Sequence, residues 1–147
     1  TIDFGARYEG YVSDITRNVY IGSPSKKAVE IHSLLCMAHI EAVSRIKPGV
    51  AARDVDAAAR QILANRGLDK YFTHSLGHGI GLEVHEMPRL SSRSTDVLEQ
   101  GDVVTVEPGV YMEGYGGMRV EDDYLVTDKG AQRLTADIPM ELFVVMV

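Results

Sequence analysis

Four carboxylates fall inside apolar, strand-like runs of this 147-residue chain. The runs are TIDFGA, YVSDIT, VTVEPGV and MRVEDDYLV, and they carry Asp3, Asp14, Glu107 and Glu121. Strands seldom bury a carboxylate, because an unpaired buried charge is very costly. A single acid of this kind would be interpreted as facing solvent on a half-exposed strand. Four of them, together with a histidine in a glycine-rich segment, favour a site that supplies positive charge.

The histidine-rich segment, residues 74–86, reads HSLGHGIGLEVHE and carries His74, His78 and His85. It contains too much glycine for a helix, so we expect it to be extended. Its glycines leave room for the backbone or for a bound molecule to approach closely. Such a segment is unusual for packing alone, which makes its histidines candidate functional residues.

A metal would let these acids converge without mutual repulsion. The candidate ligands are Asp3, Asp14, His78, Glu107 and Glu121. Four carboxylates and one imidazole suit Mn, Co, Fe or Zn rather than a thiolate site. Four carboxylates suggest two ions, which at roughly 3.5–4 Å apart can hold a hydroxide between them and stabilise the oxyanion of an attacked carbonyl. The spacing alone does not establish such a site, and no short HExxH motif is present.

Composition excludes several classes of protein. The chain is 45% hydrophobic and 24% charged, as globular domains are, and is long enough for one domain with a core. Its net charge of −6 argues against a nucleic-acid surface. No apolar run is long enough to suggest a membrane span, and no secretory signal is visible. The single cysteine, Cys36, rules out an internal disulfide and fits a reducing cytoplasm.

Hydrophobic periodicity and turn residues predict two helices between groups of strands. The first helix begins near Ser23 or Ser25 and stops at Lys47-Pro48-Gly49, and the second covers about 52–66. Strands are expected at 1–7, 10–21, 102–112 with an interruption at Pro108-Gly109, and 119–127, with a tight connection at 113–118. This order predicts an α+β fold, with helices covering one face of a curved, mainly antiparallel sheet.

Four motifs together resemble the pita-bread metallopeptidases, and most closely their proline-specific branch of Xaa-Pro dipeptidases (prolidases) and Xaa-Pro aminopeptidases. The motifs are DFGARYEGYVSDITR, HSLGHGIGLEVHEMPRLS, TVEPGVY and GGMRVEDDYLVT, which extend over nearly the whole chain. The resemblance implies the pita-bread fold and hydrolysis of the Xaa-Pro bond of dipeptides or short peptides by a metal-bridging hydroxide. It implies two divalent ions per chain, with Mn or Co first and Zn or Fe as alternatives, and a homodimer.

The resemblance also implies a role for each candidate ligand. Asp3 resembles the chelating acid of the first metal, and Asp14 and Glu121 resemble the carboxylates that bridge both metals. His78 and Glu107 resemble the terminal ligands of the second metal. Glu107 also resembles the family's proton shuttle, which takes a proton from the bridging water and passes it to the leaving amine.

Further residues match positions that meet the substrate. His85 resembles the histidine near the scissile carbonyl, and His74 resembles one that lines the proline pocket. Arg119 matches an arginine of the proline-specific branch that orients neighbouring acids or the substrate. Tyr111 could reach the site or be a core tyrosine. A purely structural role is the alternative for His74 and His85.

Four further residues lie outside the proposed set of ligands and substrate contacts. Thr16 shares a strand face with the acid two residues before it and could hydrogen-bond a ligand carboxylate. Asp123 shares a face with Glu121, but we expect it to be solvated. His32 and His39, on the first predicted helix, are expected to be ordinary helix residues.

Family members carry an N-terminal domain and an upstream part of the catalytic domain. The sequence begins as if inside a strand, so we expect residues 1–147 to form a single, incomplete catalytic domain without those parts. A methionine aminopeptidase is the first alternative, and the short GYGG connection followed by RVED disfavours it. A metal-free binding module of this fold is the second alternative, but such relatives lack the acid set. An inactive fragment is the third.

Overall fold

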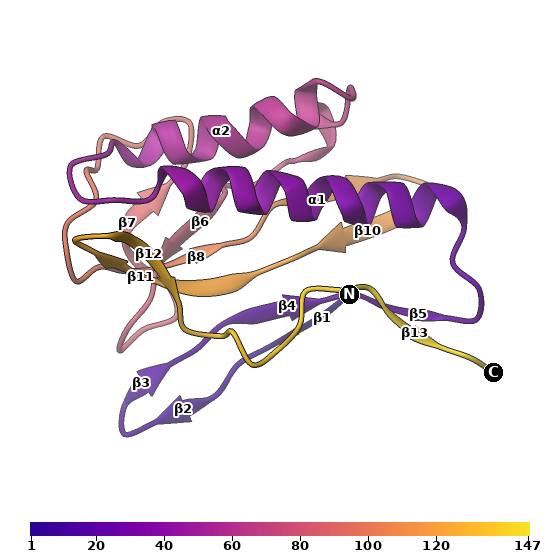
Figure 1. Cartoon of the computed structure of the whole chain (residues 1–147), viewed down its shortest axis with the longest axis horizontal. Coiled ribbons are helices and arrows are strands. Elements are labelled where there is room, and N and C mark those ends of the chain that lie inside the picture. The colour runs from indigo at the N-terminus through magenta and orange to yellow at the C-terminus, as the bar shows by residue number, and fades with distance from the viewer.

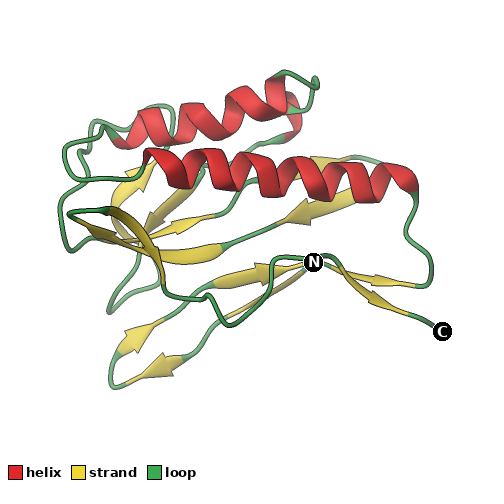
Figure 2. Cartoon of the chain, viewed as in Figure 1, coloured by secondary structure: helices red, strands yellow, loops and turns green.

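Two helices cover one face of an antiparallel sheet in the computed structural model, which describes residues 1–147 (Figure 1). Helix α1 spans Lys26–Arg45 and helix α2 spans Ala52–Ala64. They lie side by side above the sheet, and the strands β1–β4 lie on its other side (Figure 2). The buried side chains of both helices and of the central strands form one hydrophobic core.

Helix α1 begins at the second of the two predicted caps. The Ser25 hydroxyl accepts a hydrogen bond from the amide of Ala28 at 3.1 Å, which satisfies one of the free N–H groups of the first turn. The apolar stripe includes Ile31, Leu35 and Ala38, all buried against the core. The helix ends before Pro48, as predicted.

Helix α2 buries Val55, Ala59 and Leu63 and stops two residues earlier than the predicted range. Gly67 adopts a positive φ of 67°, and the amide of Leu68 donates to the carbonyl of Leu63 at 3.0 Å. A glycine in this conformation reverses the chain after a helix without steric cost. The chain then passes through the short 3₁₀ helix η1, Asp69–Tyr71, toward the sheet.

The central sheet has five strands in the order β12–β11–β8–β6–β7, all antiparallel to their neighbours. Their bounds are Gly77–Gly79 for β6, Glu86–Leu90 for β7, Val103–Val106 for β8, Asp122–Thr127 for β11 and Gly130–Arg133 for β12. The side chains that this sheet packs against α1 and α2 are mainly apolar, and a hydrogen bond of 2.8 Å between His39 of α1 and the Tyr124 hydroxyl of β11 is a polar exception.

Shorter strand pairs form four separate two-stranded sheets. The antiparallel pairs are β1 (Ile2–Phe4) with β4 (Ile15–Arg17), β2 (Arg7–Tyr8) with β3 (Tyr11–Val12), and β9 (Gly109–Met112) with β10 (Gly116–Arg119). Strand β13 (Phe143–Val145) pairs in parallel with β5 (Val19–Ile21). No helix is both long and apolar enough to cross a membrane.

The register of these strands directs the acidic side chains to one place. Asp122 pairs with Val106 in β11–β8, and Arg119 pairs with Gly109 in β10–β9. The two pairs have the same register. Glu107, between β8 and β9, therefore lies opposite Glu121, between β10 and β11. An isolated bridge between Thr16 and Glu121 joins the N-terminal strands to this point.

The predicted fold class is confirmed, and so is the interruption at Pro108, which separates β8 from β9. Three details of the prediction were wrong. The range 10–21 holds three short strands rather than one, the predicted connection 113–118 already contains the start of β10, and the histidine segment is extended only in part. Local composition does not reveal where strand pairing stops, because pairing depends on distant partners.

Candidate metal centre and adjoining cavity

The structure brings three of the five predicted ligands together. One ligand atom from each of Asp14, His78 and Glu121 lies within 4.8 Å of the others. Asp14 follows β3, His78 is the middle residue of β6, and Glu121 precedes β11. Three segments that are distant in the sequence therefore contribute to one cluster.

Glu107 adjoins this cluster. Its Oε1 lies 3.4 Å from His78 Nε2, while Asp14 Oδ2 lies 3.9 Å from the same nitrogen. The hydroxyl of Thr105 accepts a hydrogen bond from the His78 amide at 3.1 Å and donates to Glu107 at 3.4 Å. Thr105 thereby ties the backbone of β6 to the carboxylate at the end of β8. The sequence analysis missed it, although the alternation of strand residues puts it on the face of Glu107.

His78 presents a free nitrogen to the acids. Its Nδ1 donates to the carbonyl of Gly79 at 3.0 Å, because a carbonyl oxygen can only accept. In the neutral ring this leaves Nε2 without a proton, and Nε2 faces Asp14 and Glu107. Burial lowers the pKa of His78 and favours the neutral form. A neutral imidazole fixed in this tautomer is suited to bind a metal ion.

Asp3, the fifth predicted ligand, lies at the exposed edge of the site. Its Oδ2 accepts a hydrogen bond from Arg119 Nη2 at 2.6 Å. Burial raises the pKa of the Asp14 carboxyl group, and the nearby charge of Asp3 raises it further. The fifth acid is thus adjacent to the cluster and is paired with a cation of the protein itself.

Arg119 links several groups around the acids. Its Nε donates to the Thr16 hydroxyl at 3.0 Å, and its Nη1 donates to the Tyr111 hydroxyl at 2.9 Å. The Thr16 hydroxyl in turn donates to Glu121. The prediction that Thr16 hydrogen-bonds a carboxylate of the site is therefore met, and Tyr111 reaches the site.

Two glutamates carry strongly shifted pKa values. Burial, followed by the charge of neighbouring acids, raises the pKa of Glu121 to about 8, and burial likewise raises that of Glu107 to about 7. Buried carboxylates this close to each other resist ionisation unless a cation pairs with them. Arg119 Nε lies 3.6 Å from Glu121 and 3.8 Å from Glu107, outside hydrogen-bond distance. The donor set therefore fits divalent cations, which supply the missing positive charge.

Asp123 corrects the sequence analysis, which expected a solvated side chain. It is buried, and its Oδ2 accepts a hydrogen bond from the backbone amide of Asp14 at 3.1 Å. Burial raises its pKa to about 7. The N-terminal strands cover this face of β11, and for this reason Asp123 is enclosed rather than solvated.

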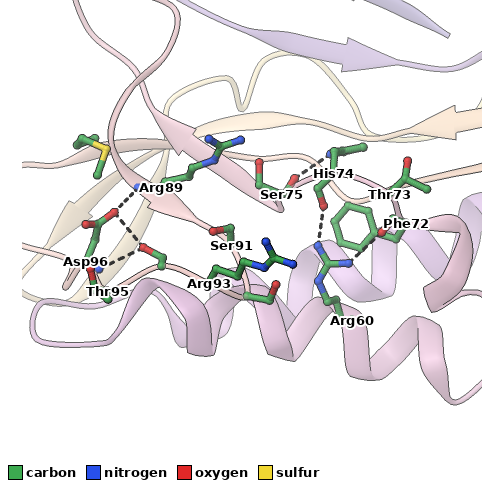
Figure 3. A pocket seen from close by; sticks show the side chains of 13 residues that line it. Arg60, Phe72, Thr73, His74, Ser75, Arg89, Ser91, Arg93, Thr95 and Asp96 are labelled. Atoms are coloured by element: carbon green, nitrogen blue, oxygen red, sulfur yellow. Dashed lines mark hydrogen bonds between the residues drawn. The ribbon is translucent and has the colours of Figure 1, made fainter.

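The predicted substrate-contacting residues share a cavity of about 460 Å³ beside the cluster. The His85 ring lies against that of His78, with ring centroids 4.4 Å apart, and His74 Nδ1 lies 3.9 Å from Glu107 Oε2. The cavity is lined by His74, Ser75, His78, His85, Glu86, Met87, Arg89, Glu107 and Arg119. A second, larger cavity of about 810 Å³ adjoins it and shares His74, Ser75, Met87 and Arg89 with it (Figure 3).

A curved antiparallel sheet beneath two helices, with three acids and a histidine close together at the point where its strands meet, defines a metal-binding domain of the pita-bread type. The sequence model of metallopeptidase family M24 matches residues 1–128. The chain belongs to this family. Its membership accounts for the motifs in which the clustered residues occur.

Individual relatives agree with this assignment. The chain is 50% identical over 134 residues to an Xaa-Pro dipeptidase of Pyrococcus horikoshii, covering 91% of this chain and 38% of that protein. It superimposes with a TM-score of 0.94 on an X-Pro aminopeptidase from Thermotoga maritima, at 46% identity, covering 97% of this chain and 40% of the other. An Xaa-Pro dipeptidase from Bacillus anthracis gives a TM-score of 0.94 at 49% identity, with the same coverage of 97% and 40%. The chain spans about 40% of the length of these relatives.

Proposed function

We propose that the protein is a dinuclear metal-dependent peptidase that hydrolyses the Xaa-Pro bond of dipeptides or short peptides. In this proposal residues 1–147 form part of a single catalytic domain. The observation that carries the proposal is the position of Glu107, which borders both the ligand cluster and the cavity that holds His74, His85 and Arg119. A cleft that joins metal ligands to potential substrate contacts is what peptide hydrolysis requires.

Asp3, Asp14, His78, Glu107 and Glu121 would hold two divalent ions, of which Mn or Co suit the donors best and Zn or Fe are alternatives. When bound, such ions lower the pKa of water and polarise a carbonyl oxygen. Glu107 would move a proton from the attacking water to the leaving amine. Its Oε1 lies 3.4 Å from His78 Nε2 and its side chain borders the cavity, so it could reach both the ligand cluster and a bound peptide.

The remaining residues of the cavity would position the substrate. His85, whose ring lies against that of His78, would contact the scissile carbonyl. His74 would border the proline ring, and Arg119 would orient Tyr111 and Asp3 through its hydrogen bonds. These roles require groups held in fixed positions, and hydrogen bonds hold both His74 and Arg119.

We further infer a homodimer and a cytoplasmic setting. The setting is supported by Cys36, a free and partly buried thiol suited to a reducing compartment. The homodimer is implied by family resemblance and stays a prediction, which sedimentation of the purified protein would check.

The test is hydrolysis of Ala-Pro and of Met-Ala-Ser by the purified protein, with and without added Mn²⁺ or Co²⁺. We expect metal-dependent cleavage of Ala-Pro and about two ions per chain by elemental analysis. The Glu107→Ala variant should lose at least ~100-fold in turnover, the loss typical of a missing general base. Preferred cleavage of Met-Ala-Ser would instead indicate a methionine aminopeptidase. No bound metal after addition of Mn²⁺ would indicate a metal-free binding module or an inactive fragment.

A further inference from the structure

An ion pair on α2 holds the segment that carries His74. Asp56 is fully buried on this helix, and its two carboxylate oxygens accept hydrogen bonds from Arg60 Nε at 2.7 Å and Nη2 at 3.1 Å. The pair is bidentate, the strongest arrangement for an arginine and a carboxylate. A fully buried carboxylate on an otherwise apolar helix face needs a reason beyond helix stability.

The pair reaches three backbone groups of the segment 72–76. Arg60 Nη1 donates to the carbonyl of Phe72 at 2.9 Å, and Nη2 donates to the carbonyl of His74 at 2.6 Å (Figure 3). Asp56 Oδ1 accepts from the amide of Leu76 at 3.1 Å. The segment forms no strand of its own before β6, so these bonds replace the sheet ladder that would otherwise fix it.

Ring contacts also link Arg60, through Phe72, to the side chain of His74. The guanidinium of Arg60 lies 4.2 Å from the centroid of the Phe72 ring, and that ring meets the His74 ring edge-on at 5.0 Å. His74 Nδ1 donates to the carbonyl of Ser75 at 2.8 Å, which leaves Nε2 to accept from the Tyr111 hydroxyl at 3.1 Å. The imidazole is therefore fixed in both position and tautomer beside Glu107.

We propose that Asp56 and Arg60 are positioning residues, which act on the reaction only through the placement of His74 in the substrate cavity. This inference rests on the proposed peptidase function. Neither side chain borders the cavity of about 460 Å³ that holds Glu107, and Arg60 lines only the adjoining cavity of about 810 Å³, so a direct role at the scissile bond is not available to them. Their effect must pass through the segment that they hold.

The diagnostic variant is Arg60→Lys. Lysine keeps the positive charge that the buried Asp56 needs, but it cannot bind both carboxylate oxygens and two carbonyls at once. The matched control is Arg45→Lys on α1. Arg45 pairs with Glu41 at the same i,i+4 spacing, at 2.7 and 3.1 Å, but this pair is exposed and contacts no other segment.

For Arg60→Lys we expect kcat/KM on Ala-Pro to fall by about 10–100-fold, since a displacement of order 1 Å at a reacting site can cost 10²-fold. Bound metal should stay at the wild-type level, and Arg45→Lys should have wild-type kinetics. In a His74→Ala background, Arg60→Lys should change kcat/KM by less than about 2-fold, because the residue through which it acts is gone. Equal fold-losses in both backgrounds, or wild-type rates for Arg60→Lys, would overturn the proposal.

A second variant and an NMR measurement test the role of Asp56 and Arg60 separately from the peptidase activity. Should Arg60→Lys fail to fold by circular dichroism, Asp56→Asn, which keeps the acceptor for Leu76, is expected to give the same kinetic pattern. Should the wild-type protein not cleave Ala-Pro, the proposed function fails. The NMR resonance of the His74 ring then decides the positioning role. It should shift in Arg60→Lys but not in Arg45→Lys, and an unchanged resonance would refute the role of the pair.

Discussion

Thr16 is the residue of the N-terminal strands whose side chain hydrogen-bonds Glu121. Its hydroxyl donates to Glu121 and accepts from Arg119 Nε at 3.0 Å, so it holds the carboxylate and the guanidinium in relation to each other. Groups that fix a ligand carboxylate usually matter for metal affinity nearly as much as the ligands do.

Thr16→Val is therefore expected to weaken Mn²⁺ binding by about 10–100-fold, because valine keeps the shape but loses both hydrogen bonds. Isothermal titration calorimetry measures the change directly. Thr95→Val, at an exposed threonine away from the acids, is the control and should bind Mn²⁺ as the wild type does. Unchanged affinity in Thr16→Val would mean that Glu121 does not need this support to bind metal.

A variant of His85 can distinguish loss of substrate contact from loss of bound metal. Its ring lies against that of His78, yet it is not among the side chains whose ligand atoms converge. His85→Ala is expected to lower kcat/KM on Ala-Pro by about 100–1,000-fold, the range for loss of one group that stabilises the transition state. The bound metal should not change. Loss of metal in this variant, measured by elemental analysis, would place His85 among the ligands instead.

At the scale of single residues, the sequence was informative where a charged side chain interrupts an apolar, strand-like run. Asp14, Glu107 and Glu121 could be recognised because each interrupts an apolar run. Asp123 was misjudged, since its burial depends on the N-terminal strands and not on its own neighbours. Nothing in the sequence singled out Asp56 and Arg60, and only the fold reveals that the segment 72–76 lies against them.

At the scale of elements, β6 is the strand on which the site depends, because it presents His78 between β7 and β8. A Cβ at Gly77 would overlap the carbonyl oxygen of Thr105 on β8, and a Cβ at Gly79 would overlap that of Met87. These two glycines allow the neighbouring backbones to approach. The sequence predicted close approach in this segment, but which strands approach could not be inferred without the topology.

Gly77→Ala is expected to destabilise the protein by about 3 kcal/mol or more, at the high end of single substitutions, because backbone rather than a flexible side chain must move. Chemical denaturation measures the loss, and metal binding should fall with it since His78 is the next residue. Gly81→Ala is the matched control in the same segment. Its added Cβ meets only the end of the Glu86 side chain, 2.9 Å away, which can move aside. Equal losses in the two variants would contradict the role assigned to β6–β8 packing.

At the scale of the whole molecule, the titration of buried groups couples the site to stability. Burial raises the pKa of Glu107 to about 7 and that of Glu121 to about 8, from an ordinary 4.5. Without metal, the folded protein retains protons that the unfolded chain releases in this interval, so the free energy of unfolding falls as pH rises from about 4.5 to 8. His39 acts in the opposite direction, because burial lowers its pKa to about 4 and protonation of the unfolded chain below 6.5 favours unfolding.

Divalent ions reverse the effect of the glutamates, because they bind the deprotonated carboxylates of the folded state only. We therefore expect the increase in Tm caused by saturating Mn²⁺ to be larger at pH 8 than at pH 5, by roughly 5 °C or more, given that about 1 kcal/mol moves the Tm of a chain of this size by roughly 2–4 °C. Differential scanning calorimetry with chelator or Mn²⁺ at both pH values measures it. The double variant Glu107→Gln/Glu121→Gln removes two of the titrating acids and keeps His39 and Asp123, whose pKa burial also raises to about 7. Its Tm in chelator should therefore decrease less between pH 5 and pH 8 than that of the wild type. A Tm increase by Mn²⁺ that is equal at both pH values would mean that the buried acids are not the groups that bind the ions.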